Sequence, residues 1–171
     1  MAVLEIVQFP HPVLKEKTET VEGINQAIEK LVKDMADTMY HAPGSGLAAN
    51  QVGVNKQIMV GDVSQAEEEK DTIVIINPRI ISMSDETEIM EEGCLSVPDF
   101  RAEVERAVTV TVLGKDLEGE DIEVEAEGFF ARVLQHEIDH LNGVLYIDRI
   151  GRLKRQRYVR QRKKALAALK K

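Results

Sequence analysis

The stretch "EGFFARVLQHEIDHLNG", residues 127–143, sets two histidines four positions apart and places a glutamate directly after the first. At the helical period of 3.6 residues, the apolar side chains of one side form a stripe made up of Phe130, Leu134, Ile138 and Leu141. His136 and His140 point roughly to the opposite side, which Phe129 and Val133 share. The Asn-Gly pair that closes the stretch is a typical helix end. The stretch therefore predicts a helix that is buried on both sides.

Two imidazoles one helical turn apart can bind the same metal ion, and a glutamate next to them can reach a metal-bound water without being a ligand. Two core histidines with satisfied hydrogen bonds are the alternative, but the complete His-Glu-x-x-His pattern favours a metal. A catalytic metal usually has three protein ligands and a water. Position 146 is Tyr146 and no Asp, Glu, His or Cys follows Asp148, so we expect the third ligand upstream of the helix.

The composition is typical of a globular protein with one domain. The chain has 171 residues, of which 43% are hydrophobic, and it contains no long apolar run, so we expect no contact with a membrane. The start "MAVLEIVQF" has no basic segment followed by an apolar block, which predicts a cytoplasmic protein without a secretory signal. The single cysteine, Cys94, excludes an internal disulfide and fits a reducing compartment.

The remaining periodicities predict an α+β fold. They indicate an amphipathic N-terminal helix with Asn25 as its cap, two strands and a β-hairpin. These elements cover residues 25–42, 57–63, 72–77 and 107–126. The acidic segment 64–71 is expected to be a solvated loop. We therefore expect antiparallel β-sheets packed around the central helix 127–143.

Cys94, in "MEEGCLSVPDF", is the candidate for the third ligand. A buried cysteine is usually only a small apolar side chain. Together with two imidazoles, however, its thiolate makes a ligand set for zinc or ferrous iron that leaves a position open for water. Alternatively Cys94 is a nucleophile with His136 or His140 as its base, an interpretation that leaves Glu137 without a clear role.

The segment "PGSGLAANQVG", residues 43–53, is rich in glycine but lacks the Gly-Lys-Ser/Thr sequence of a phosphate-binding loop. Its glycines would let the backbone approach a ligand closely, and the Gln51 amide could donate a hydrogen bond to developing negative charge. An ordinary turn before a strand is the alternative for this segment.

Three segments together resemble the signature motifs of the peptide deformylases, in the same order and spacing. They are "GSGLAANQ" (44–51), "EGCLS" (92–96) and "QHEIDHLNG" (135–143). The resemblance covers nearly the whole chain. It implies a metal-dependent hydrolase that removes the N-formyl group from the formyl-methionine of newly synthesised polypeptides and releases formate. We expect residues 1–151 to form the catalytic domain and 152–171 to add a basic helix to it.

The resemblance also implies the composition of a metal site. One divalent ion would be bound by Cys94, His136 and His140, with Glu137 acting as general base and then as general acid. The expected physiological metal is ferrous iron, Fe²⁺, and Zn²⁺, Ni²⁺ or Co²⁺ could occupy the same site.

Further roles carried over by the resemblance concern the substrate. The Gln51 amide and the backbone N–H of Leu95 would hold the oxyanion. The substrate would be contacted by Gly46, Arg101, Phe129 and Val133, in a pocket apolar enough for a methionine side chain. Ser45 departs from the pattern, because many family members have an aliphatic residue there. The detailed shape of the pocket is therefore left open.

Two other classes of protein stay as alternatives. A metallopeptidase that cleaves an ordinary peptide bond could use the same helix, although a cysteine ligand is unusual there. A non-catalytic metal-binding or RNA-associated domain with a purely structural metal is less compatible with the sequence, since structural zinc sites normally have four protein ligands and no fourth candidate is evident.

The C-terminal run "RLKRQRYVRQRKKALAALKK", residues 152–171, contains ten Lys or Arg and no acidic residue. Since the whole chain carries −8 and this run carries +10, the rest of the chain carries −18. We expect a basic helix, and the resemblance suggests that it docks on the ribosome, through ribosomal RNA or the proteins at the tunnel exit. A solvated helix that lies on the acidic body is the alternative.

Overall fold

The structure is a computed structural model, and it describes residues 2–64 and 69–170. Seven strands are present in this part of the chain: β1 (Gly46–Ala48), β2 (Ile58–Asp62), β3 (Thr72–Met83), β4 (Thr87–Cys94), β5 (Val97–Ala107), β6 (Thr109–Lys115) and β7 (Asp121–Glu127). The helices are α1 (Gln26–His41), α2 (Gly128–Leu141) and α3 (Arg152–Leu169), and the short 3-10 helices are η1 (Pro12–Lys15), η2 (Ala49–Val52) and η3 (Tyr146–Arg149).

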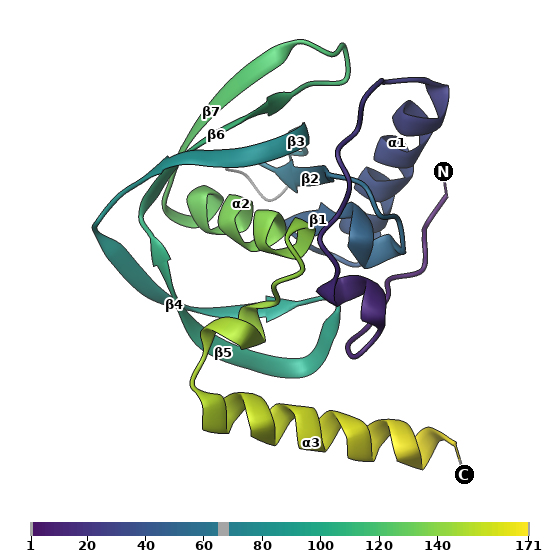
Figure 1. The fold of residues 1–171 in the computed structure, drawn as a ribbon, viewed down its shortest axis with the longest axis vertical. Helices are drawn as coiled ribbons and strands as arrows, with labels where there is room; N and C mark the ends of the chain where they lie inside the picture. Colours follow the sequence, from purple (N-terminus) through teal and green to yellow (C-terminus); the bar gives the residue numbers. More distant parts are fainter. Residues whose placement is uncertain (1, 65–68, 171) are drawn as a thin grey trace.

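The strands form two separate antiparallel sheets, which confirms the α+β class predicted from the sequence. Five strands pair in the order β1-β2-β3-β6-β7, and β4 pairs with β5 in a two-stranded ribbon. Helix α2 lies between the five-stranded sheet and this ribbon, as Figure 1 shows. The helix therefore contacts strands of both sheets.

The apolar stripe of α2 packs on the five-stranded sheet. Leu134, Ile138 and Leu141 are buried in one cluster with side chains of β2, β3 and β6. Because each side chain is nearly or fully enclosed, replacing Leu134 by alanine should cost about 2–5 kcal/mol. The prediction of burial on both sides is wrong at the first turn, where Phe129 is 59% exposed. The helix ends as predicted, with Gly143 at a φ of 76° that favours glycine.

The predicted N-terminal helix is confirmed as α1, and the Asn25 side chain caps it by accepting a hydrogen bond from the N–H of Ile28. The predicted hairpin is confirmed as β6 and β7. The second predicted strand, by contrast, is longer than expected, because β3 continues past Asn77 and Pro78 to Met83. The pairing of β3 with β6 shifts register between Ile76 and Arg79. Asn77 lies at this shift with a φ of 53°, and its side chain exchanges two hydrogen bonds with the backbone of Val21.

The expected solvated loop 64–71 lies partly outside the described residues, while 69–71 are exposed. Helix α3 lies on the far side of the ribbon from α2 (Figure 1). The side chain of Tyr158 attaches this helix to the rest of the protein, and it is 2% exposed. It packs on the rings of Phe9 and Phe100 and donates a hydrogen bond to the carbonyl of Pro98. Within the described part of the chain, no helix is long and apolar enough to cross a membrane.

Candidate active site

The three predicted ligands come together from two elements. Cys94 is the last residue of β4, and His136 and His140 lie one turn apart on α2. Cys94 Sγ is 3.2 Å from His140 Nε2, which is itself 3.2 Å from His136 Nε2. All three ligand atoms lie within 4.8 Å of one another, and this is the single such group of three found among the described residues.

These distances fit one tetrahedral metal ion. Ligand atoms that share an ion at the usual Zn–N and Zn–S lengths lie about 3.3–3.6 Å apart. The donor set of one thiolate and two imidazoles suits Zn²⁺ and Fe²⁺. Three protein ligands also leave a fourth position for a water or a substrate atom, as in catalytic sites.

The two histidines have different electrostatic surroundings. Burial lowers the pKa of His140, and the neighbouring His136 lowers it further. Burial acts in the same direction on the pKa of His136, but hydrogen bonds with Cys94 and Glu92 outweigh it and raise this pKa well above its usual range.

Glu137 lies next to this cluster with a free carboxylate oxygen. Its Oε2 is buried and has no hydrogen-bond partner among the described residues. Burial raises the pKa of the Glu137 carboxyl to about 7, against the attraction of His136 and Arg106, and a metal cation beside it would lower that pKa. Gly46 packs directly on it: a Cβ on Gly46 would lie 2.7 Å from Glu137 Oε1. Only glycine leaves the carboxylate this position.

A buried charged network holds His136 through its Nδ1, and this network was not predicted from the sequence. His136 Nδ1 is 2.8 Å from Glu92 Oε1, so its Nε2 is free to face the ligand cluster. Burial would raise the pKa of Glu92, but hydrogen bonds from Arg106 and His136 keep it well below its usual range. Arg132 from α2 binds the same carboxylate at 2.6 Å. The position of Glu92 two residues before Cys94 was the available signal.

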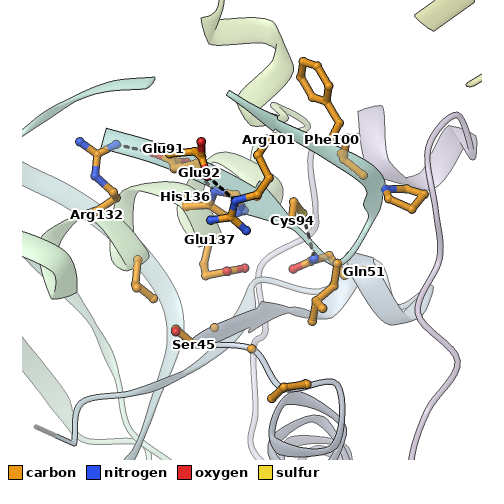
Figure 2. Close-up of a pocket in the computed structure, with 18 of the residues that line it drawn as sticks. Ser45, Gln51, Glu91, Glu92, Cys94, Phe100, Arg101, Arg132, His136 and Glu137 are labelled. Atoms are coloured by element: carbon orange, nitrogen blue, oxygen red, sulfur yellow. Dashed lines mark hydrogen bonds and ion pairs between the residues drawn. The ribbon is translucent and has the colours of Figure 1, made fainter. Parts of the chain in front are cut away.

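The Gln51 side chain is fixed by its own backbone neighbourhood. Its Oε1 accepts a hydrogen bond from the N–H of Ala48 at 2.9 Å, which turns the amide nitrogen toward the cleft. That nitrogen lies 3.6 Å from Cys94 Sγ and 3.2 Å from Ser96 Oγ. Figure 2 shows Gln51 and Cys94 facing each other. Leu95 follows Cys94 in the turn that joins β4 to β5.

A cleft of about 610 Å³ opens over these groups, between the ribbon, α2 and the glycine-rich segment. All the predicted substrate-contacting residues line it, namely Gly46, Arg101, Phe129 and Val133. Ser45 lines it as well, which makes this part of the wall more polar than an aliphatic residue would. Arg101 is exposed and paired with Glu91 at 2.7 Å, on the ribbon side of the cleft (Figure 2).

The chemistry of this cleft is typical of a metal-dependent hydrolase, since three side chains that could hold one metal ion lie beside a carboxylate with a free oxygen. The sequence profile described as polypeptide deformylase matches residues 3–156. A peptide deformylase of Rhizobium meliloti is 50% identical over 165 residues, which cover 96% of this chain and 95% of the relative.

Solved structures agree with the sequence comparison. A peptide deformylase from Ehrlichia chaffeensis in complex with actinonin superimposes with a TM-score of 0.91 at 41% identity, and covers 96% of this chain and 98% of its own. A Met-Ala-Ser-bound peptide deformylase from Acinetobacter baumannii has a TM-score of 0.83 at 38% identity, over 87% and 99% of the two chains. The chain belongs to the peptide deformylase family. It is a hydrolase that removes the N-formyl group from newly synthesised polypeptides.

Proposed function

We propose that Cys94, His136 and His140 hold the metal ion of this deformylase and that Glu137 moves the proton during formyl hydrolysis. The convergence of the three ligand atoms within 4.8 Å is the observation that carries the proposal. We propose Fe²⁺ as the physiological metal, with Zn²⁺, Ni²⁺ or Co²⁺ able to replace it, because a mixed thiolate and imidazole set accepts each of these ions. The central helix α2 is then the metal-binding helix of the fold.

A metal ion held by Cys94, His136 and His140 would supply Lewis acidity, which would polarise the formyl carbonyl and make the attacking water more acidic. Glu137 accepts the proton of the attacking water through its free Oε2 and later gives it to the leaving amine. The Gln51 amide and the N–H of Leu95 donate hydrogen bonds to the oxyanion that forms. Loss of one such donor typically costs about 100- to 1,000-fold in rate.

The substrate peptide would lie along the cleft with its methionine side chain against Val133 and Phe129. The backbone at Gly46 is open to it because no side chain stands there, and Arg101 would lie near the residues that follow. The Acinetobacter baumannii relative binds Met-Ala-Ser, a peptide that begins with methionine, which supports a peptide of this kind as the ligand.

The competing role for Cys94 is that of a nucleophile with a histidine base. The distance of 3.2 Å between Cys94 Sγ and His140 Nε2 is compatible with both roles. The second imidazole at the same 3.2 Å spacing favours the metal, because a nucleophile needs one base and not two.

The basic C-terminal segment 152–171 would bring the enzyme to its substrate. We propose that it docks on the ribosome, on RNA or protein at the tunnel exit, in the cytoplasm. Seven of its basic residues are exposed within the described residues 152–170: Arg152, Lys154, Arg157, Arg160, Lys163, Lys164 and Lys170. The segment would act as an addition to the catalytic unit 1–151.

The proposed function is tested by formate release from a short formyl-methionyl peptide. The protein is purified without oxygen, its metal content is measured, and each of the four metals is restored in turn to the metal-free protein. We expect one metal per chain and formate release that returns with the metal. Peptide fragments from internal cleavage, or no formate with any of the four metals, would contradict it.

A further inference from the structure

We propose that Arg132 is a positioning residue of the metal centre, which holds the strand that carries Cys94 against the helix that carries the two histidines. The inference rests on the proposed metal site. Arg132 contacts none of the three ligands itself, so its effect would act through the position of other groups.

The metal ligands need such an element because they belong to two parts of the fold. Cys94 ends β4 in the two-stranded ribbon, whereas α2 packs its apolar stripe on the five-stranded sheet. The ribbon and that sheet share no ladder of backbone hydrogen bonds in the described residues. The distance between the thiolate and the imidazoles therefore depends on side chains that bridge the ribbon and α2.

Arg132 is a bridging side chain that reaches both strands of the ribbon. From α2, its Nη1 donates to Glu92 Oε2 at 2.6 Å and to the carbonyl of Val104 at 2.8 Å, and its Nη2 donates to the carbonyl of Glu88 at 2.7 Å. Glu88 and Glu92 lie on β4 and Val104 lies on β5, so one guanidinium ties both strands of the ribbon to the helix. The side chain is only 5% exposed, which keeps water from replacing these contacts.

The same contact also orients a ligand. Glu92 Oε2 accepts from Arg132 and from Arg106 Nε, while Oε1 accepts from Arg106 Nη2 and lies 2.8 Å from His136 Nδ1. The carboxylate that holds the His136 ring is thus fixed from two sides by two arginines. Figure 2 shows Arg132, Glu92 and His136 together on one side of the cleft. Without Arg132, Glu92 loses one of its four contacts, and the backbone carbonyls of Glu88 and Val104 lose a side-chain donor.

Arginine is required for this geometry because its planar fork reaches three acceptors at once, which an ammonium on a lysine stem does not reproduce. A purely structural ion pair would stabilise the fold and leave the metal site unchanged. The two roles can be separated, because only a positioning role alters the metal affinity and the ligand field of the folded protein.

The test compares Arg132→Met and Arg132→Lys with the wild-type chain and with Arg149→Met as the matched control. Arg149 pairs with Asp139 at the outer end of the same network and, within the described part of the chain, forms no hydrogen bond with Glu92. Co²⁺ affinity is measured by competition with a chelator, and the absorption spectrum of the Co²⁺ form reports on the thiolate and imidazole ligands. Thermal unfolding of the metal-free proteins measures the structural contribution.

We expect Arg132→Met to bind Co²⁺ roughly 10- to 100-fold more weakly than the wild-type chain, with a changed spectrum, as loss of an outer contact typically does. Arg132→Lys should fall between the two, and Arg149→Met should match the wild type in affinity and spectrum.

Wild-type affinity and spectrum in Arg132→Met would overturn the inference, even if that variant unfolds at a lower temperature. If Arg132→Met does not fold, Arg132→Lys decides: wild-type affinity and spectrum in that variant would overturn it as well. A wild-type protein that binds no Co²⁺ would instead refute the metal site on which the inference rests.

Discussion

Helices α2 and α3 both carry many charged or titratable side chains, yet burial gives those side chains different surroundings. On α2, Arg132, Glu137 and Asp139 are nearly enclosed. Arg132 and Asp139 each have an oppositely charged partner within 3 Å. On α3 the basic side chains are mostly exposed. Among the described residues, α3 takes part in one ion pair, between Arg155 and Asp148.

The difference shows what a charge can do at each place. A buried charge is costly unless it is paired, so the groups around α2 are fixed and can hold a metal and a substrate in one geometry. Exposed charges act over a longer range and are screened by salt, so α3 can attract a polyanion without specifying one geometry. Changes on α2 should therefore affect chemistry, and changes on α3 should affect location.

The largest effect on metal binding is expected for Cys94→Ser. The substitution removes a thiolate that contributes both charge and a bond, so metal affinity should fall by more than the roughly 100-fold seen for outer contacts. Metal content after dialysis measures it. An inactive Cys94→Ser protein that keeps a full complement of metal would favour the nucleophile instead, as would a formylated Cys94 trapped by rapid quenching.

A smaller effect is expected for Gly46→Ala, which pushes on Glu137 without removing any ligand. The new Cβ would lie 2.7 Å from Oε1 and 2.8 Å from Cγ of Glu137, so that side chain must move. We expect kcat to drop by roughly 10- to 100-fold with metal still bound. Gly23→Ala is the control, because nothing lies within 4 Å of its Cβ. Equal kcat values in the two variants would show that the position of Glu137 is not critical.

Asp148, which joins α3 to the rest of the protein through Arg155, leads to a prediction for the pH dependence of stability. Burial would raise the pKa of Asp148, but hydrogen bonds from Lys15, the Leu145 N–H and Arg155 lower it overall. Because the folded pKa lies below the unfolded value of about 3.9, this stabilisation is complete above that pH and is lost as the pH falls below it.

Asp148→Asn should therefore reduce the free energy of unfolding by about 1 kcal/mol at pH 7 and by much less near pH 2. Chemical denaturation at the two pH values measures both differences. A difference that is the same at both would contradict the assignment.

The smallest effect on catalysis is expected for the exposed face of α3. Deleting the whole helix would also remove Tyr158, which packs on Phe9 and on the cleft residue Phe100, so substitutions are the cleaner test. A variant with glutamine in place of four exposed basic residues keeps the buried side of the helix. The four are Arg157, Arg160, Lys163 and Lys164.

Hydrolysis of a short formyl-methionyl peptide by this variant should stay within about twofold of the wild type, because none of the four residues lines the cleft. Its co-sedimentation with ribosomes should weaken and lose about three units of slope in a plot of log affinity against log salt. Unchanged, salt-insensitive ribosome binding would favour the alternative of a helix that is only solvated.

The parts of the molecule that could be predicted from the sequence are those with a strong local signal. The spacing of His136 and His140 and the single Cys94 were enough to predict the ligand cluster. The β4–β5 ribbon was not predicted, because its outward positions carry glutamates and its inward positions include Glu92 and Arg106. Charged residues are rarely buried, so a sequence pattern treats such positions as exposed. Their burial depends on pairing across strands and helices that only the folded chain brings together.

The measurement that tests the central claim most directly is made on Glu137→Gln. The three ligands are intact in this variant and the glutamine has nearly the same size, while the proton acceptor is gone. Metal content and formate release from a formyl-methionyl peptide are measured on the same preparations of variant and wild-type protein. We predict one metal per chain in both and a rate of formate release about 1,000-fold lower in the variant. Near-normal formate release by metal-loaded Glu137→Gln would contradict the account.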